Sequence, residues 1–215
     1  MVGTKCWLFN FTNYNSNQGE GNTKNLLAAG AFVLATVMAT IPAVAQEKPF
    51  TINGDGNLVR PTDYRSWVYV GTPVTPNDLN DGAAAFPEFH AVYIDPESYR
   101  IYKETGKFRE NTILIKELVS VGSKQAVSDA GYFMGDFIGL EATIKSAEHF
   151  PDEPGNWAYF SFTNKEGPLK GVTNAFDTGS CNACHEGAAA DDFVFTQYYP
   201  VLRAAKGFGK GTPEN

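Results

Sequence analysis

Cysteine, histidine and basic residues are all scarce in this chain. It has 3 Cys and 3 His among 215 residues, and its 17 Lys and Arg are outnumbered by 24 Asp and Glu. Because Cys6 falls in an apparent N-terminal leader, only Cys181 and Cys184 are left for the folded part, which excludes the disulfide framework of small secreted domains. The acidic balance, without any basic stripe, argues against nucleic acid as a partner.

The scarce cysteines and histidines meet at one point, Cys181-Asn182-Ala183-Cys184-His185. The two cysteines lie about one helical turn apart, so both sulfurs can reach the vinyl groups of one haem. The histidine that follows can then ligate the iron, and C-x-x-C-H is the pattern of c-type haem attachment. The sequence therefore predicts one haem c per chain, held through Cys181 and Cys184, with His185 as the metal ligand.

Two other interpretations of the motif are a redox dithiol and half of a zinc site. Zinc needs two further Cys or His ligands, and outside the leader only His90 and His149 remain, neither at a ligand spacing. A thioredoxin-like dithiol is expected near a βαβ pattern, whereas this motif lies near the end of the chain. Haem attachment is therefore the favoured interpretation.

The N-terminal part has the features of an export signal. An apolar, alanine-rich run at 26–45 follows Lys24 and ends in Ala43-Val44-Ala45, a small-x-small cleavage pattern. We expect cleavage before Gln46 and export to the periplasm, where c-type haem is attached; a retained membrane anchor is the alternative. The predicted organisation is a signal peptide at 1–45, a loose polar N-terminal arm at 46–60 and a haem-binding domain at 61–215.

The rest of the sequence alternates short apolar segments with Gly, Pro and Asn-rich loops. The patterns predict a helix from Pro61 to Gly71 and another from Pro96 to Gly106. They also predict strands at 86–94, 112–121, 132–144 and 156–163, and C-terminal helices at the Cys181 motif and at 195–206, the latter broken at Pro200. The predicted class is α+β: an antiparallel β-sheet with flanking helices on one side, carrying the haem near the C-terminus.

Strand alternation groups the residues of 132–144 by face. Met134 lies on the opposite face from Glu141, so core packing is the favoured role for Met134 rather than ligation of the iron. Glycines within a strand allow close approach of a ligand, and Glu141 would then be an acid/base group beside it. The alternative is that the glycines mark bulges and Glu141 is a solvated strand end. One face carries Phe133, Gly135, Phe137, Gly139 and Glu141.

Lys116 lies in the strand at 112–121 and shares a face with Leu114 and Leu118. A lysine buried there would have its charged form disfavoured and its amine lone pair exposed, as a covalently acting lysine requires. Spacing alone favours the simpler interpretation of a surface residue.

Seven segments together resemble the cytochrome P-460 family, the lysyl-haem cytochromes that oxidise hydroxylamine. These segments are residues 64–72, 92–99, 116–122, 131–141, 153–158, 181–185 and 199–206, the last together with Phe195.

The resemblance implies roles that spacing could not assign. Lys116 matches the lysine that is bonded to a meso carbon of the porphyrin, and Glu141 matches the distal proton relay. It further implies a haem iron open on its distal side, a homodimer, and oxidation of hydroxylamine to nitrous oxide, with nitric oxide and nitrite as other reachable products. Hydroxylamine and nitric oxide are the implied small ligands, and a periplasmic c-type cytochrome is the implied electron acceptor.

His90 departs from the family pattern, which has an arginine at this position of the pocket. Arginine is always charged, whereas histidine titrates near neutrality and can ligate a metal. His90 is therefore a further candidate catalytic residue that could tune the pH response of the pocket or compete for the iron. The alternative is a histidine that only fills space.

Two other functions stay open on the sequence. One is a gas-binding protein resembling cytochrome c′-beta, which holds nitric oxide in an apolar pocket without a lysine bond; Lys116 and Glu141 argue against it. The other is an electron-transfer cytochrome with Met134 or His90 as the sixth ligand.

Overall fold

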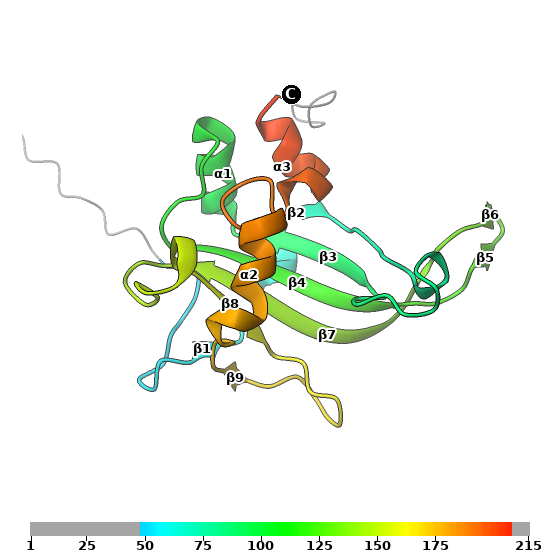
Figure 1. The fold of residues 1–215 in the computed structure, drawn as a ribbon, viewed down its shortest axis with the longest axis horizontal. Coiled ribbons are helices and arrows are strands. Elements are labelled where there is room, and N and C mark those ends of the chain that lie inside the picture. The colour runs from blue at the N-terminus through cyan, green and yellow to red at the C-terminus, as the bar shows by residue number, and fades with distance from the viewer. Residues whose placement is uncertain (1–47, 208–215) are drawn as a thin grey trace, which may run out of the picture. The chain divides into compact units, whose positions relative to one another are not determined.

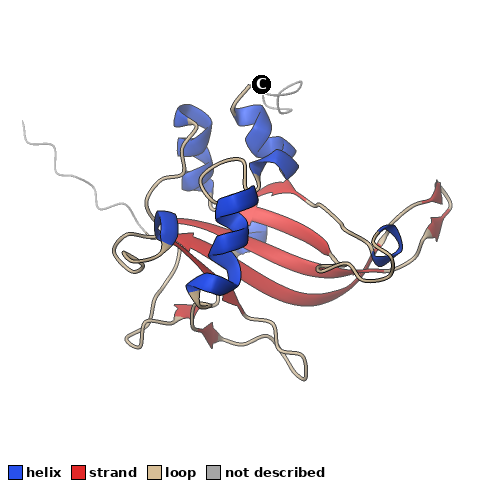
Figure 2. Ribbon diagram, in the orientation of Figure 1, coloured by secondary structure: helices blue, strands red, loops and turns tan. Residues whose placement is uncertain are grey.

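A five-stranded sheet in the order β2-β3-β4-β7-β8 forms the centre of the computed structural model, which describes residues 48–207 (Figure 1). All neighbouring strands in it are antiparallel. With few helices beside it, this sheet confirms the predicted α+β class (Figure 2). The strands are β2 (Val68–Gly71), β3 (Phe89–Ile94), β4 (Thr112–Val121), β7 (Met134–Lys145) and β8 (Trp157–Ser161).

The first predicted helix is wrong, whereas the four predicted strands are present. In place of a helix from Pro61 to Gly71, the chain makes one 3-10 turn, η1 (Tyr64–Ser66), and then enters β2. Val68 of β2 pairs with Ile94 of β3. β-branched and aromatic residues fit a pleated sheet well once a partner strand is available, so strand pairing overrides the weak helical periodicity here.

Three α-helices are present among residues 48–207: α1 (Pro96–Thr105), α2 (Thr178–Ala188) and α3 (Pro200–Ala205). The start of α1 is set by Asp95, whose carboxylate accepts a hydrogen bond from the backbone N–H of Ser98 at 2.9 Å. Gly106 ends it with a φ of 69°. The chain breaks at Pro200 as predicted, since the 3-10 turn η4 (Thr196–Tyr198) precedes α3. No helix in 48–207 is long and apolar enough to cross a membrane.

The predicted loose arm instead packs onto the sheet, as far as it is described from residue 48. Phe50 and Leu58 are buried in the same apolar cluster as sheet residues, because covering apolar side chains offsets the entropy lost in ordering the segment. Strand β1 (Leu58–Val59) also pairs with β9 (Val172–Thr173). The predicted signal peptide lies outside the described residues.

The sheet separates two apolar clusters, one on each face. The first contains Tyr102 of α1 and Leu202 of α3, packed on sheet residues such as Leu114. The partly buried Cys181 of α2 packs against this cluster. The second contains the N-terminal segment and sheet residues such as Ile115. Because Leu114 and Ile115 are successive residues, alternation along β4 assigns them to different clusters. The three α-helices therefore cover one face of the sheet, as predicted.

Strand β7 carries a bulge that changes the predicted grouping of its side chains. Leu118 pairs with Gly139 but Val119 pairs with Phe137, so Ile138 is an extra residue. Phe137 consequently turns away from Glu141 and lies under the guanidinium of Arg65 on the other face, 5.7 Å from its centre. The prediction from strict alternation, which placed Phe137 on the same face as Glu141, is therefore wrong.

Two further predictions for β7 concern Gly139 and Met134. A Cβ at Gly139 would meet the side chains of Thr163 and Leu118, so the space beside this glycine is filled by protein side chains. Met134 pairs with Val121 while Glu141 pairs with Lys116, which keeps the two on opposite faces as predicted. Met134 is 52 % exposed, however, so its predicted role in core packing is wrong.

A second two-stranded ribbon, β5 with β6, extends from the loop between β4 and β7 (Figure 1). The remaining short elements are β5 (Gln125–Ala126), β6 (Asp129–Ala130), η2 (Asn77–Leu79) and η3 (Pro154–Asn156).

Candidate functional site

Helix α2 carries the whole C-x-x-C-H motif and is fixed to the edge strand of the sheet. Buried Asn182 donates a side-chain hydrogen bond to the carbonyl of Trp157 in β8 at 2.9 Å. Cys181 is partly buried against the apolar cluster under the helix, and Cys184 is exposed; both are free thiols. The helix therefore presents two unpaired sulfurs from successive turns, and one of them lies toward the sheet.

His185 is oriented by its surroundings before any metal is considered. Its Nδ1 lies 2.7 Å from the carbonyl oxygen of Phe193, to which it can only donate. Its ring packs between Tyr159 and Phe195, with centroid distances of 4.4 Å and 4.6 Å. Burial lowers the pKa of His185, which favours the neutral ring. A neutral ring that donates from Nδ1 leaves the Nε2 lone pair for a metal, as in other histidine ligands.

The loop after α2 places the carbonyl that orients His185. Asp192 and Phe193 both have left-handed backbone conformations, with φ values of 42° and 62°, which are unusual for residues other than glycine. Asp192 is held there by Trp157, whose Nε1–H donates to its carboxylate at 3.2 Å, and by Lys145 at 3.0 Å. A hydrogen-bonded network thus supports a strained loop conformation beside the site.

Lys116 and Glu141 face the same side of the sheet as α2. They are directly opposite in the β4–β7 pairing, and Lys116 Nζ lies 2.6 Å from Glu141 Oε2, with both side chains 29 % exposed. Spacing alone favoured a surface position for Lys116, but its side chain is mostly covered. The ammonium also lies 5.8 Å from the centre of the Phe86 ring.

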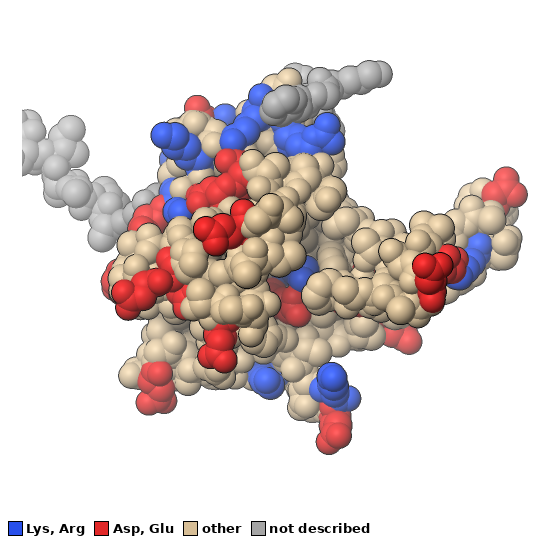
Figure 3. Space-filling model, in the orientation of Figure 1, with Lys and Arg blue, Asp and Glu red and all other residues tan. Residues whose placement is uncertain are grey.

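The sheet pair and the helix motif belong to one site. Burial, and then the Glu141 carboxylate, raise the pKa of the Cys181 thiol. Burial, with a smaller effect of Lys116, lowers the pKa of His185. Such effects act over short distances, so the charged pair on the sheet and the ligand set on α2 face a common space. The space-filling view shows the surface hollowed beside α2 (Figure 3).

His90 lies on the same face of β3, where it pairs with Leu118, next to the Val92–Lys116 pair. Its Nε2 is 3.3 Å from Oε1 of Glu88, and the two side chains are 17 % and 12 % exposed. Burial lowers the pKa of His90, the positive charge of Lys116 lowers it further, and Glu88 opposes both. The residue that departs from the family pattern is therefore brought to the site, with a carboxylate partner of its own.

The residues present fit a haem c. The donor set consists of two free thiols one helical turn apart, a neutral imidazole with an available Nε2, and a lysine with a carboxylate on the facing strands. This is the chemistry needed for two thioether bonds, one axial ligand and an acid/base group on the far side.

Sequence reasoning missed several residues that shape this site. Glu88 lies in a loop without a motif, and the Phe193 carbonyl depends on the tertiary path of the chain. Tyr159 was only part of the predicted strand at 156–163, with no role assigned to it. A search for aromatic residues near the motif would have found Phe195.

Comparison with known proteins gives one positive finding. A family model described as Cytochrome P460 matches residues 61–196, which include every site residue described above. No curated protein matches the chain.

Proposed function

The chain belongs to the cytochrome P460 family and is a haem cytochrome, and on that premise we propose that it oxidises hydroxylamine. The observation that carries the proposal is the Lys116–Glu141 pair, with 2.6 Å between Nζ and Oε2, on the sheet face toward α2. An electron-transfer haem needs two axial ligands and no acid/base group. A lysine and a carboxylate held together on this sheet face are instead what a reaction that releases protons would use.

In this proposal Cys181 and Cys184 hold the haem by thioether bonds, and His185 ligates the iron through Nε2. The haem supplies the one-electron redox chemistry and the binding position for a small nitrogen compound. Tyr159 and Phe195 fix the plane of the imidazole by packing on it. The Phe193 carbonyl accepts from Nδ1, which makes the ring a stronger ligand.

Lys116 is the third covalent attachment in the proposal. An amine can bond to carbon only as the neutral base, so its ammonium must first lose a proton. The Glu141 carboxylate is in hydrogen-bonding distance to take that proton. The pair therefore suits deprotonation of the lysine and the later handling of protons. The bond itself would replace a meso C–H bond of the porphyrin, so its formation would also require a two-electron oxidant such as a peroxide.

Glu141 is the proposed proton acceptor during turnover. Conversion of hydroxylamine to nitrous oxide and water releases protons and electrons in equal number. The Glu141 carboxylate is partly covered, and once Lys116 is bonded to the haem its ammonium no longer lies beside this carboxylate. The carboxylate can then accept a proton from the bound substrate. The electrons leave to an external acceptor, which we propose to be a periplasmic c-type cytochrome.

The charge distribution supports a basic acceptor. Acidic side chains gather around α2, whereas Lys and Arg gather over α1 and α3 (Figure 3). An acidic surface beside the exposed Cys184 would steer a basic protein toward the edge of the haem. We further propose export to the periplasm and assembly as a homodimer.

Proteolysis of the purified protein followed by mass measurement of haem peptides tests the proposal. We expect one haem joined to both the Cys181–Cys184 peptide and the Lys116 peptide. The variant Lys116→Met should keep the haem on the cysteines and lose the third attachment. Lys124→Met, which removes a lysine paired with Asp78 elsewhere, should retain it.

Steady-state turnover of hydroxylamine with an artificial electron acceptor completes the test. The wild-type protein should consume hydroxylamine and release nitrous oxide, and Lys116→Met should not. A haem attached only through the cysteines, without turnover, would contradict the proposal and favour a nitric-oxide-binding protein resembling cytochrome c′-beta.

A further inference from the structure

Glu88 and His90 form a covered pair at the start of β3. The carboxylate and the ring are 3.3 Å apart, and neither side chain is more than about one-fifth exposed. A neutral imidazole that donates from Nε2 to a carboxylate carries its lone pair on Nδ1, where it can accept a proton. The pair is thus able to take up a proton at one ring nitrogen and release another at the opposite one.

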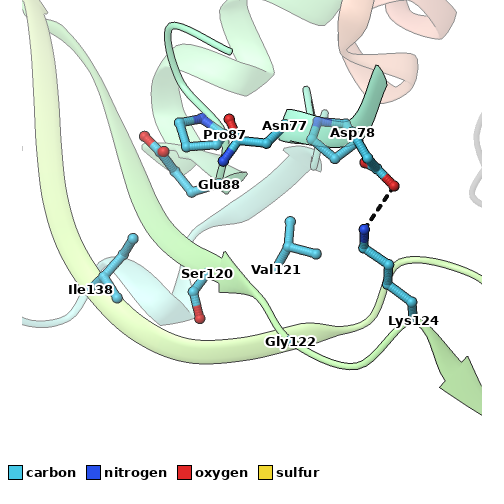
Figure 4. A pocket seen from close by; sticks show the side chains of 10 residues that line it. Asn77, Asp78, Pro87, Glu88, Ser120, Val121, Gly122, Lys124 and Ile138 are labelled. Carbon is cyan, nitrogen blue, oxygen red and sulfur yellow. Dashed lines mark hydrogen bonds and ion pairs between the residues drawn. The ribbon is translucent and has the colours of Figure 1, made fainter. Parts of the chain in front are cut away.

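On its outer side Glu88 borders a hollow of about 350 Å³. Figure 4 shows its side chain at this hollow, with Ser120 and Ile138 across from it and the Asp78–Lys124 ion pair at the other end. The space has room for water, and its lining offers polar groups to bind it. Glu88 is therefore the residue that lies both at the hollow and against His90.

On its inner side His90 approaches the charged pair of the site. His90 and Lys116 share one face of adjacent strands and are separated by one diagonal step in the pairing, a spacing that long side chains bridge. Phe86 lies against both, with its ring 6.2 Å from the His90 ring and 5.8 Å from Lys116 Nζ. The ionisable groups that act on His90 are Lys116 from β4, Glu141 from β7 and Glu88 before β3.

We propose that Glu88 and His90 carry protons from Glu141 to water in the hollow. In each transfer a proton from the pocket forms a bond to Nδ1 of His90, and the Nε2–H bond breaks as its proton moves to Glu88. Glu88 then releases that proton to water. The neutral ring is left with its one proton on Nδ1, and it regains the Nε2–H form by giving one proton to water and taking another from water. The inference rests on the proposed function, because hydroxylamine oxidation is the source of the protons.

The electrostatic setting suits this role. Burial lowers the pKa of His90, whether or not Lys116 is bonded to the haem, while Glu88 raises it. The ring is consequently neutral at neutral pH and can accept a proton, and the carboxylate stabilises the charged form that follows. Without Glu88 the imidazolium would lose the carboxylate that lies 3.3 Å from its ring, so proton uptake would become harder.

Histidine ring NMR of the haem-loaded protein, reduced and saturated with carbon monoxide so that it is diamagnetic, tests the pair directly. The chain has 3 His, so three ring signals are expected. In the wild type the His90 signal should titrate below the ordinary pH range of histidine, and Glu88→Gln should move its midpoint lower still. Asp78→Asn is the matched control, since Asp78 lines the same hollow but pairs with Lys124; it should leave His90 unchanged.

Turnover supplies the second measurement. We expect Glu88→Gln to lower kcat for hydroxylamine roughly tenfold, to leave KM unchanged and to enlarge the solvent deuterium isotope effect. Glu88→Asp should restore most of the rate, and Asp78→Asn should behave as wild type. A role in folding alone would change neither the isotope effect nor the pH profile.

The outcomes separate the two proposals. If Glu88→Gln leaves the His90 midpoint where it was, or moves it no more than Asp78→Asn does, the pair is not coupled and the inference is overturned. If the midpoint shifts but kcat and the isotope effect do not, the pair exists without carrying protons, and the inference is again overturned. If Glu88→Gln shifts the His90 midpoint but the wild-type protein never oxidises hydroxylamine, the proposed function is contradicted instead.

Discussion

Lys116 and Glu117 are successive residues of β4, yet their side chains lie on opposite faces of the sheet in different surroundings. Lys116 faces α2 and pairs with Glu141, both 29 % exposed. Glu117 faces the other way and is 6 % exposed. Its Oε1 accepts hydrogen bonds from Tyr64 and Arg65, each at 2.6 Å. Both faces thus contain a carboxylate beside a cation, with different partners around it.

The difference shows which pair can take part in chemistry. Arg65 is always protonated, and the Tyr64 hydroxyl has its pKa raised by burial and by Glu117, so neither releases a proton to Glu117 in the ordinary pH range. A lysine can lose its proton to a neighbouring base. The same β-strand therefore holds on one face a carboxylate whose donors keep their protons, and on the other a carboxylate paired with a lysine that can lose one.

The largest expected effect comes from Glu141→Gln, which removes the proposed base with almost no change of shape. We expect hydroxylamine turnover to fall on the order of 10²- to 10³-fold, while haem attachment through Cys181 and Cys184 and the free energy of unfolding stay near wild type. Stopped-flow and steady-state rates with haem-stained gels measure both. Unchanged turnover would remove Glu141 from the mechanism. The carboxylate on the Lys116 face would then be no more catalytic than Glu117 on the opposite face.

Glu117→Gln should have the reverse profile. The amide cannot neutralise Arg65 and loses charge-assisted hydrogen bonds from two donors, which we expect to lower the free energy of unfolding by about 2–3 kcal/mol. Denaturant titration of the holoprotein measures this loss. Turnover per folded molecule should stay close to wild type; a large loss of turnover with full stability would show that both faces serve catalysis.

Gly155→Ala tests how the scaffold supports the site from the helix side. Gly155 has a φ of 61°, and a Cβ there would lie 2.6 Å from the Phe193 ring. We expect a stability loss of about 1–2 kcal/mol from the left-handed conformation and a displaced Phe193 carbonyl.

A weaker iron–histidine bond at His185, seen by resonance Raman spectroscopy, would report that displacement. Gly171→Ala is the control, since a Cβ at Gly171 meets nothing within 4 Å. The same stability loss in both variants would show that the effect is not specific to the His185 loop.

The smallest expected effect is a pH dependence from His90. Because burial lowers its pKa in the folded state, the unfolded chain binds a proton more readily. Its contribution to stability is fully present above the unfolded pKa, about 6.5, and is lost as the pH falls through the folded pKa.

His90→Gln should therefore flatten the decline in unfolding free energy below pH 6.5 without changing its slope above pH 7, as measured by denaturant titrations over that range. An equal decline in the variant would assign the dependence to other groups. Glu117→Gln, which leaves His90 in place, should keep the wild-type decline.

Elements bounded by local signals could be predicted from the sequence. The start of α1 at Asp95-Pro96 and its end at Gly106 depend on capping groups within a few residues, and β4 has the predicted bounds because its run of apolar and β-branched residues is uninterrupted. The bulge at Ile138 could not be predicted, since an extra residue is defined only against a partner strand. The same holds for β2, which exists because β3 is there to pair with it.

The sequence determined that this protein is a haem cytochrome of its family: the motif at 181–185 sets two cysteines three residues apart with a histidine directly after them, and further segments carry the family resemblance. The tertiary structure alone decided which other groups meet that motif. Antiparallel register set Glu141 opposite Lys116, and the left-handed turn at Phe193 oriented His185. Such contacts join residues far apart in the chain, and their geometry follows from sheet register and loop path, which no local pattern encodes.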